Sequence, residues 1–209
     1  MTIEFCGLPG VGKSTIARAL ESHGFERVRI ESKWELLQKN LEYLVRYPRA
    51  FIKMFFCIVR TSRSHGRLYR LFMNVFLDTN ARILKAQQLP VFAIVDQGHL
   101  QALLSLSYHA LTDDEIRAYL KHLPPPDVVL AFEAPPSVRE AHLSERGYRP
   151  RDGEKTDTHE WLLYLEENAA RVVSVVEEYM PYKTIRVHTD RPIAETVSFI
   201  RAAFKEYES

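Results

Sequence analysis

The chain has 209 residues, of which 46% are hydrophobic and 26% are charged, and its formal net charge is +1. These values are typical of one globular domain with a sizeable core, and the net charge points to no charged partner. No stretch approaches the roughly 18 apolar residues of a membrane span. Glu4 and Gly7 interrupt any early run that would indicate a secretory leader. The two cysteines, Cys6 and Cys57, lie in apolar surroundings, so we expect reduced thiols and a cytoplasmic protein.

The first motif is a glycine-rich turn near the start of the chain. Residues 7–14 read Gly-Leu-Pro-Gly-Val-Gly-Lys-Ser, the G-x-x-x-x-G-K-S pattern of a phosphate-binding loop, or P-loop. An apolar strand over 2–6 precedes it and a helix over 13–23 follows, so backbone N–H groups and a helix N-terminus converge on one point. We expect Lys13 to reach the β- and γ-phosphates of a nucleoside triphosphate and Ser14 to hold Mg²⁺. The residues expected to contact the nucleotide here are Gly7, Pro9, Gly10, Val11, Gly12, Lys13, Ser14 and Thr15.

Further elements follow from apolar periodicity and turn residues. In chain order we expect a strand over 26–31, helices over 33–88, a strand over 91–95, helices over 99–107 and 112–122, a strand over 127–132, helices over 136–146 and 157–180, a strand over 184–188 and a helix over 192–206. Five strands alternating with helices predict a three-layer α/β/α sandwich around a parallel sheet. Ligands of such a sheet bind at the carboxyl ends of its strands.

The helical stretch 33–88 carries an uneven charge. Between Tyr43 and Leu77 there are seven basic residues and no acidic one: Arg46, Arg49, Lys53, Arg60, Arg63, Arg67 and Arg70. On a helix over 48–63, four of these cations fall on one side, while Phe51, Met54, Phe55, Ile58 and Val59 take the other, which we expect to face the core. The cations form a solvated helix face, grip an anionic acceptor, or contact an anionic membrane or nucleic acid.

Two other features fit phosphoryl transfer. Asp96 directly follows the strand 91–95, where a carboxylate can orient a metal-bound water or take a proton from an attacking hydroxyl; the alternative is a cap for the next helix. Arg146, Arg149 and Arg151 lie in a glycine-containing loop, 146–156, that can close over the transferring group. The alternative for these arginines is a solvated basic loop.

Taken together, five motifs carry a resemblance. They are Gly7–Ser14, Val-Asp-Gln-Gly at 95–98, Pro-Asp-Val-Val-Leu-Ala-Phe-Glu-Ala-Pro-Pro at 126–136, Ser-Glu-Arg-Gly-Tyr-Arg-Pro-Arg at 144–151 and Val-His-Thr-Asp-Arg-Pro-Ile at 187–193. Their order over nearly the whole chain resembles the thymidylate-kinase-like group of P-loop nucleoside and nucleotide kinases. The resemblance implies a P-loop NTPase fold with strand order 2-3-1-4-5, a helical insertion between strands 2 and 3 that binds the acceptor, and ATP as the phosphoryl donor.

The resemblance also implies roles for individual residues. Asp96 matches the group's acid, but Gln97 stands where that group has an arginine that holds the acceptor. Arg60 and Arg63 can replace that arginine. Glu31 and Trp34 resemble, at a shifted spacing, the glutamate and tryptophan beside the acceptor base, and a core Trp beside a solvated Glu is the alternative. Asp190 lies in the turn where such kinases often contact adenine.

We therefore expect a single kinase domain over 1–209, with an acceptor-binding insertion at 33–88 and a lid at 146–156. The expected function is transfer of the γ-phosphoryl group of ATP to a small hydroxyl- or phosphate-bearing acceptor, nucleoside-like or not. The alternative is a nucleotide-gated ATPase module whose basic helices contact a membrane, a nucleic acid or a protein. For the kinase we expect no nucleic-acid or membrane partner, and the apolar helices of 33–88 can pair two chains.

Overall fold

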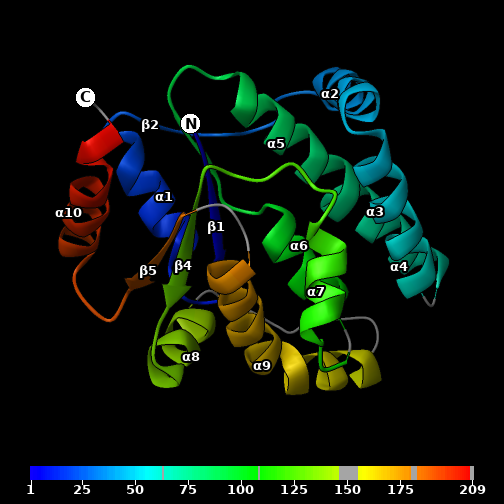
Figure 1. Cartoon of the computed structure of the whole chain (residues 1–209). Coiled ribbons are helices and arrows are strands. Elements are labelled where there is room, and N and C mark those ends of the chain that lie inside the picture. Colours follow the sequence, from blue (N-terminus) through cyan, green and yellow to red (C-terminus); the bar gives the residue numbers. More distant parts are fainter. Residues whose placement is uncertain (63, 108, 146–154, 180–182, 208–209) are drawn as a thin grey trace.

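The structure is a computed structural model that describes residues 1–62, 64–107, 109–145, 155–179 and 183–207 (Figure 1). A five-stranded sheet in the order β2-β3-β1-β4-β5 forms its centre. The strands are β1 (Thr2–Gly7), β2 (Phe25–Arg27), β3 (Phe92–Val95), β4 (Val128–Glu133) and β5 (Lys183–His188). All the neighbouring pairs are parallel. The predicted fold class and strand order are therefore confirmed.

Helices cover both faces of the sheet, because residues of the buried strands alternate between two apolar layers. Ile3 and Phe5 of β1 pack against α1 (Lys13–Glu21) and α10 (Ile193–Phe204). Cys6 of the same strand packs on the opposite face against α6 (His99–Leu106), α7 (Asp113–Leu120) and α9 (Lys155–Tyr179). Figure 1 shows α1 and α10 on one side of the sheet, away from α6 and α7.

The stretch between β2 and β3 is helical nearly throughout, as predicted. It consists of α2 (Lys33–Arg46), α3 (Pro48–Thr61), α4 (His65–Leu71), a π-helical turn η1 (Phe72–Leu77) and α5 (Asp78–Gln88). α3 begins at Pro48, where a missing N–H costs nothing, and α4 begins at a Ser64 side chain that accepts from the Arg67 N–H. The π-turn interrupts an otherwise continuous helix between α4 and α5. The remaining helical elements are α8 (Pro136–Glu145) and a terminal 3₁₀ turn η2 (Lys205–Tyr207).

Three details differ from the sequence predictions. The second strand ends at Arg27 rather than 31. On α3, Met54 and Ile58 are buried as predicted, but Phe55 and Val59 are 38% and 42% exposed, because only a narrow side of this helix packs on the rest of the chain. Arg67, which belongs to the basic set, is only 4% exposed rather than solvated.

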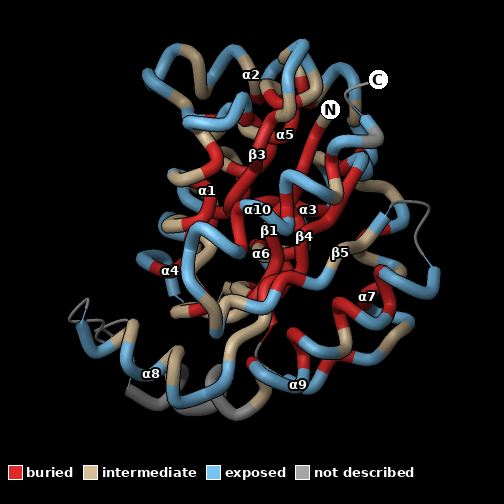
Figure 2. Tube along the Cα trace, turned by 90° about the vertical axis from the view of Figure 1, so that its left-hand side faces the viewer, coloured by how far each residue is buried: buried red, intermediate tan, exposed pale blue. Residues whose placement is uncertain are grey.

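Burial along the trace follows the same plan (Figure 2), with buried residues concentrated in the central strands and in the sides of the helices that face them. Within the described ranges, no helix has the length and apolar character needed to cross a membrane.

Candidate active site

The P-loop connects β1 to α1 through two glycines with left-handed backbones. Gly10 has φ 86° and Gly12 has φ 84°, values that favour glycine. A Cβ on Gly10 would also lie 2.8 Å from the Arg139 carbonyl oxygen of α8. The Gly12 carbonyl accepts from the N–H groups of Thr15 and Ile16, each at 3.0 Å, which begins α1. The turn is therefore built as an open loop that ends at a helix N-terminus.

Two side chains from distant elements brace this loop. His142 of α8 lies with its Nδ1 2.8 Å from the Gly10 carbonyl oxygen. The Thr189 hydroxyl, just after β5, donates to the Val11 carbonyl oxygen at 2.9 Å and lies 3.2 Å from that of Glu133. Sequence reasoning missed both residues. Only the turn that contains Thr189 carries a sequence signal, and that signal points to the neighbouring Asp190, which is exposed.

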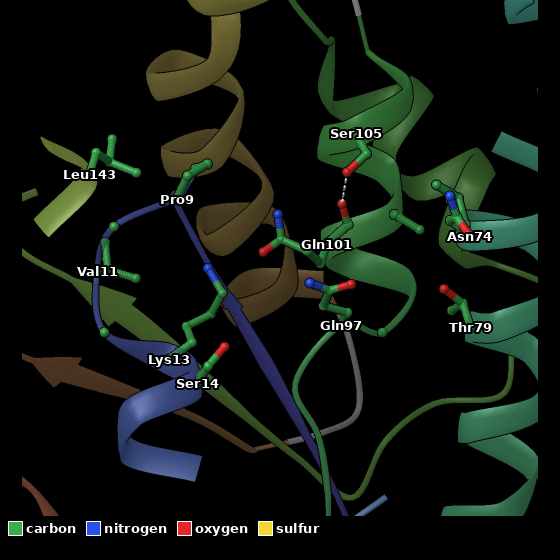
Figure 3. Close-up of a pocket in the computed structure, with 15 residues that line it drawn as sticks. Pro9, Val11, Lys13, Ser14, Asn74, Thr79, Gln97, Gln101, Ser105 and Leu143 are labelled. Atoms are coloured by element: carbon green, nitrogen blue, oxygen red, sulfur yellow. Dashed lines mark hydrogen bonds between the residues drawn. The ribbon is translucent and has the colours of Figure 1, made fainter. Parts of the chain in front are cut away.

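Lys13 folds back over the loop that precedes it. Its Nζ donates to the carbonyl oxygens of Gly7 at 2.5 Å and Leu8 at 2.9 Å. Lys13 and Ser14 line a cavity of about 340 Å³ together with Pro9, Gly10, Val11 and Gly12. Figure 3 shows Lys13 and Ser14 on the P-loop side of this cavity. A cation, a hydroxyl and a helix N-terminus together form a site suited to phosphate oxygens.

The other walls of the cavity come from the helical stretch and from α6. The polar residues there are Asn74 of η1, Thr79 of α5, Gln97 in the turn after β3, and Gln101 and Ser105 of α6. Figure 3 shows these residues around the space in front of Lys13. Of the residues predicted for the acceptor, the structure brings Gln97 to this cavity. Asn74, Thr79, Gln101 and Ser105 were missed, because neutral side chains within helices carry no motif.

Asp96 lies beside this cavity but does not line it. It is 3% exposed, and its two carboxylate oxygens are held by different arginines. Arg27, the last residue of β2, places its Nη2 2.8 Å from Oδ2, and Arg82 of α5 places its Nη1 3.0 Å from Oδ1. Arg82 also contacts Asp78 at 2.8 Å. In this conformation Asp96 ties β2, β3 and α5 together, and it does not cap α6.

Glu4, in the middle of β1, is an acidic residue that sequence reasoning did not assign to the site. It is fully buried, and its Oε1 accepts from the Leu100 N–H at 2.6 Å. Burial raises the pKa of this carboxyl to about 8, although the N–H groups of Leu100 and Gln101 act in the opposite direction. Gly98 permits the approach, since a Cβ there would lie 2.3 Å from the Glu4 carboxyl carbon. Glu4 thus holds the first turn of α6, the helix that carries Gln101 and Ser105.

Several predicted site residues lie elsewhere. Glu31 is exposed, Trp34 is 73% exposed, and neither lines the cavity. Arg60 lines a second cavity, of about 780 Å³, between α3, α6 and α7. The remaining predicted residues, Arg63, Arg146, Arg149 and Arg151, lie outside the described residues.

Comparisons with known proteins agree with this architecture. A family model described as "AAA domain" matches residues 3–170. None of the curated proteins compared with the chain matches it.

Among solved structures, the chain is similar to deoxyadenosine kinase from M. mycoides with the products dCMP and dCDP bound, at TM-score 0.60 and 16% identity over 99% of this chain and 100% of that chain. The same kinase with dATP bound gives TM-score 0.55 at 15% identity, covering 98% and 99% of the two chains. Thymidylate kinase from Candida albicans gives TM-score 0.52 at 15% identity, covering 99% and 92%. These neighbours confirm, at the level of fold, the resemblance to the thymidylate-kinase-like group.

Proposed function

Because the chain belongs to the AAA domain family and has the fold of P-loop nucleoside and nucleotide kinases, we propose that it is an ATP-dependent phosphotransferase. Its reaction moves the γ-phosphoryl group of ATP to a small hydroxyl- or phosphate-bearing acceptor. The observation that carries this proposal is the cavity in front of Lys13. One wall of the cavity is the phosphate-binding turn, and the opposite walls offer polar side chains to a second molecule, so donor and acceptor would meet there.

In this proposal the P-loop binds the donor. Lys13 leaves the carbonyl oxygens of Gly7 and Leu8 for the β- and γ-phosphates, while the backbone N–H groups of the turn bind phosphate oxygens. Thr189 stabilises the loop through its hydrogen bond to the Val11 carbonyl oxygen. Asp190, the next residue, is proposed to contact the adenine.

Mg²⁺ fits this site without a cluster of protein ligands. Within the described residues no group of three or more His, Cys, Asp or Glu side chains could hold a metal ion. Mg²⁺ bound with a nucleotide takes most of its oxygen ligands from phosphates and water, so the Ser14 hydroxyl at the cavity is a sufficient protein ligand. When bound, the ion neutralises charge on the phosphates.

Asp96 is proposed as the catalytic carboxylate of the site. It would orient a metal-bound water or take a proton from the acceptor hydroxyl. It directly precedes Gln97 and Gly98, which line the cavity. This role requires Asp96 to release one of its two arginines when the substrates bind. Arg146, Arg149 and Arg151 are proposed as the lid cations that close over the transferring group, within a lid at 146–156.

The test is a Lys13→Ala variant with Lys205→Ala, in the terminal 3₁₀ turn, as its matched control. Each protein is incubated with ATP, Mg²⁺ and a panel of candidate acceptors, and products are scored by mass for the gain of one phosphoryl group. We expect Lys13→Ala to lose at least about 100-fold in turnover while its thermal unfolding stays cooperative. Unchanged transfer by Lys13→Ala would refute the proposal.

One observation favours a different function, a nucleotide-gated ATPase module. On α3, Phe56 is 63% exposed beside the exposed cations Lys53 and Arg60. A surface that mixes aromatic and basic residues can bind anionic partners. ATP hydrolysis without transfer to any acceptor, together with binding to anionic vesicles or oligonucleotides that falls steeply with salt, would establish this rival.

We also propose a cytoplasmic homodimer that pairs through α2. Trp34, Leu37, Leu41 and Val45 recur at helical spacing, and each is at least half exposed. A second copy would cover this apolar stripe. The cytoplasmic location stays a proposal, and the free cysteines Cys6 and Cys57 are compatible with it. We expect Leu41→Glu to convert a dimer into a monomer in sedimentation experiments.

A further inference from the structure

Among the residues that the structure describes, neutral groups form the acceptor side of the cavity. Its polar residues, Asn74, Thr79, Gln97, Gln101 and Ser105, present amides and hydroxyls, each of which can donate and accept hydrogen bonds. Figure 3 shows these side chains arranged around the space that faces Lys13. Such a wall matches a ligand that itself carries several groups able to donate and to accept.

The backbone supports this wall with an unusual element. Asn74 lies on η1, the π-helical turn, and Thr79 follows on the first turn of α5. A π-turn costs hydrogen-bond geometry and occurs often at functional sites, because it redirects a side chain within a helix. Here it belongs to the segment that brings Asn74 and Val75 to the cavity.

Gln101 provides a second, independent observation. Its Oε1 is buried and has no hydrogen-bond partner among the described residues. A buried amide oxygen left without a donor costs free energy, so a turn of the Gln101 side chain that brings this oxygen to a donor group of a ligand would recover that energy on binding. Ser105, one turn later, donates its hydroxyl proton to the Gln101 carbonyl oxygen at 3.0 Å and keeps its oxygen as an acceptor.

Charge distinguishes the acceptor from the donor. Among the described residues that line the cavity, Lys13 is the only charged one, and it belongs to the P-loop. The nearby arginines Arg27 and Arg82 are both paired with Asp96. Neither Arg27 nor Arg82 lines the cavity, so a phosphate or carboxylate on the acceptor would lose water against the described part of this wall without a cation in contact with it, which is unfavourable.

The apolar part of the lining is aliphatic. It consists of Val11, Val75, Ala102 and Leu143 with Pro9, and the described lining residues include no aromatic ring. An aromatic side chain offers a nucleobase a stacking surface, as in proteins that bind single-stranded nucleic acid. Trp34, predicted for that role, does not line the cavity. The described part of the wall thus lacks the feature that would favour a nucleoside over a sugar-like molecule.

We propose that the acceptor is an uncharged, non-aromatic polyhydroxy compound, of the sugar or polyol class, recognised by Asn74, Gln97 and Gln101. This inference rests on the proposed kinase function. In the reaction, one acceptor hydroxyl oxygen forms a bond to the γ-phosphorus as the bond from that phosphorus to the β,γ-bridging oxygen breaks. The products are ADP and a phosphorylated acceptor, and the hydroxyl proton ends in solvent.

The first experiment compares acceptors in matched groups, using the full chain with ATP and Mg²⁺. The groups are neutral hexoses, pentoses and inositols, the monophosphates of the same compounds, and nucleosides with their monophosphates. We expect phosphoryl gain on a neutral sugar or polyol, with kcat/KM at least tenfold above that for its own monophosphate and for every nucleoside. Preferential phosphorylation of a nucleoside, a nucleotide or a sugar phosphate overturns the inference and leaves the kinase proposal standing. Transfer to no acceptor overturns both.

Two variants then test the wall directly, each with a control at Ser198, an exposed residue of α10 that does not line the cavity. Gln101→Leu should raise the KM for the best neutral acceptor at least tenfold while the KM for ATP stays within twofold, and Ser198→Leu should change neither. Gln97→Arg should shift the ratio of kcat/KM values at least tenfold towards the phosphorylated member of each matched pair, and Ser198→Arg should not. A Gln101→Leu enzyme with unchanged KM for the acceptor, or a Gln97→Arg enzyme with an unchanged ratio, contradicts the assignment.

Discussion

The buried carboxyl of Glu4 should make the free energy of unfolding depend on pH, and the direction of that dependence follows from its pKa. In the folded chain its pKa is raised to about 8, whereas the ordinary value is 4.5. Between these two pH values the folded chain keeps a proton that the unfolded chain has released. Stability from this group is therefore fully present below pH 4.5 and is lost as pH rises towards 8. At about 1.4 kcal/mol for each pH unit, the free energy of unfolding should fall by about 5 kcal/mol over that window.

Glu4→Gln tests this reasoning because the amide keeps the shape and the acceptor oxygen but does not titrate. The assay is urea unfolding of both proteins at intervals from pH 5 to pH 8. We expect the variant to gain roughly 4 kcal/mol relative to the wild type between those limits. Burial lowers the pKa of His99 to about 3, so the folded chain loses stability from this group as the pH falls below 6.5. Both proteins contain His99, so the difference between their unfolding free energies reports on Glu4 alone. Curves for the two proteins that stay parallel within 1 kcal/mol would refute a neutral, buried carboxyl at this position.

Other substitutions probe the same region. Gly98→Ala should destabilise the fold by about 1–3 kcal/mol in urea unfolding, because its Cβ would lie 2.3 Å from the Glu4 carboxyl carbon. Gly66→Ala on α4, where a Cβ meets nothing within 4 Å, should be neutral or stabilising by up to about 1 kcal/mol, and equal costs for the two changes would contradict the contact. Asp96→Asn should lower kcat at least about 100-fold in the phosphoryl-transfer assay and cost about 3 kcal/mol of stability, whereas Arg27→Gln should lose stability but keep kcat within about tenfold. If the two variants lose kcat equally, Asp96 serves as the ion-pair partner of the arginines and not as the catalytic carboxylate.

The sequence predicted the part of the site whose chemistry depends on a fixed local pattern. Gly10 and Gly12 permit the positive φ angles that the turn requires, and Lys13 and Ser14 supply the cation and the hydroxyl at the start of the helix. Each role depends only on the local sequence. The alternation of apolar runs likewise predicted the layers and the sheet, since a parallel strand buried on both faces leaves a continuous hydrophobic signal. The helix predicted over 48–63 also depends on local pattern, and the structure has α3 at Pro48–Thr61.

The acceptor wall depends on contacts between distant segments, and therefore left little trace in the sequence. Asn74 reaches the cavity on a π-turn, which no periodicity predicts, and Gln101 is one neutral residue in an apolar helix. Trp34 was assigned by analogy of spacing, but its helix begins with that side chain 73% exposed. Glu4 does carry a sequence signal: an acidic residue in the centre of a buried strand requires a hydrogen-bond partner, and that partner is the N-terminus of α6.

The turn after β3 connects the buried charges with the acceptor wall, because its three consecutive residues contact three different parts of the structure. Asp96 is held by arginines of β2 and α5, Gln97 enters the cavity, and Gly98 leaves room for Glu4 against the first turn of α6. The position of Gln97 is therefore fixed from both sides by buried charge and by close packing. A side chain held this firmly can select among acceptors by its own chemistry, so exchanging Gln97 should alter acceptor preference with little change in the fold.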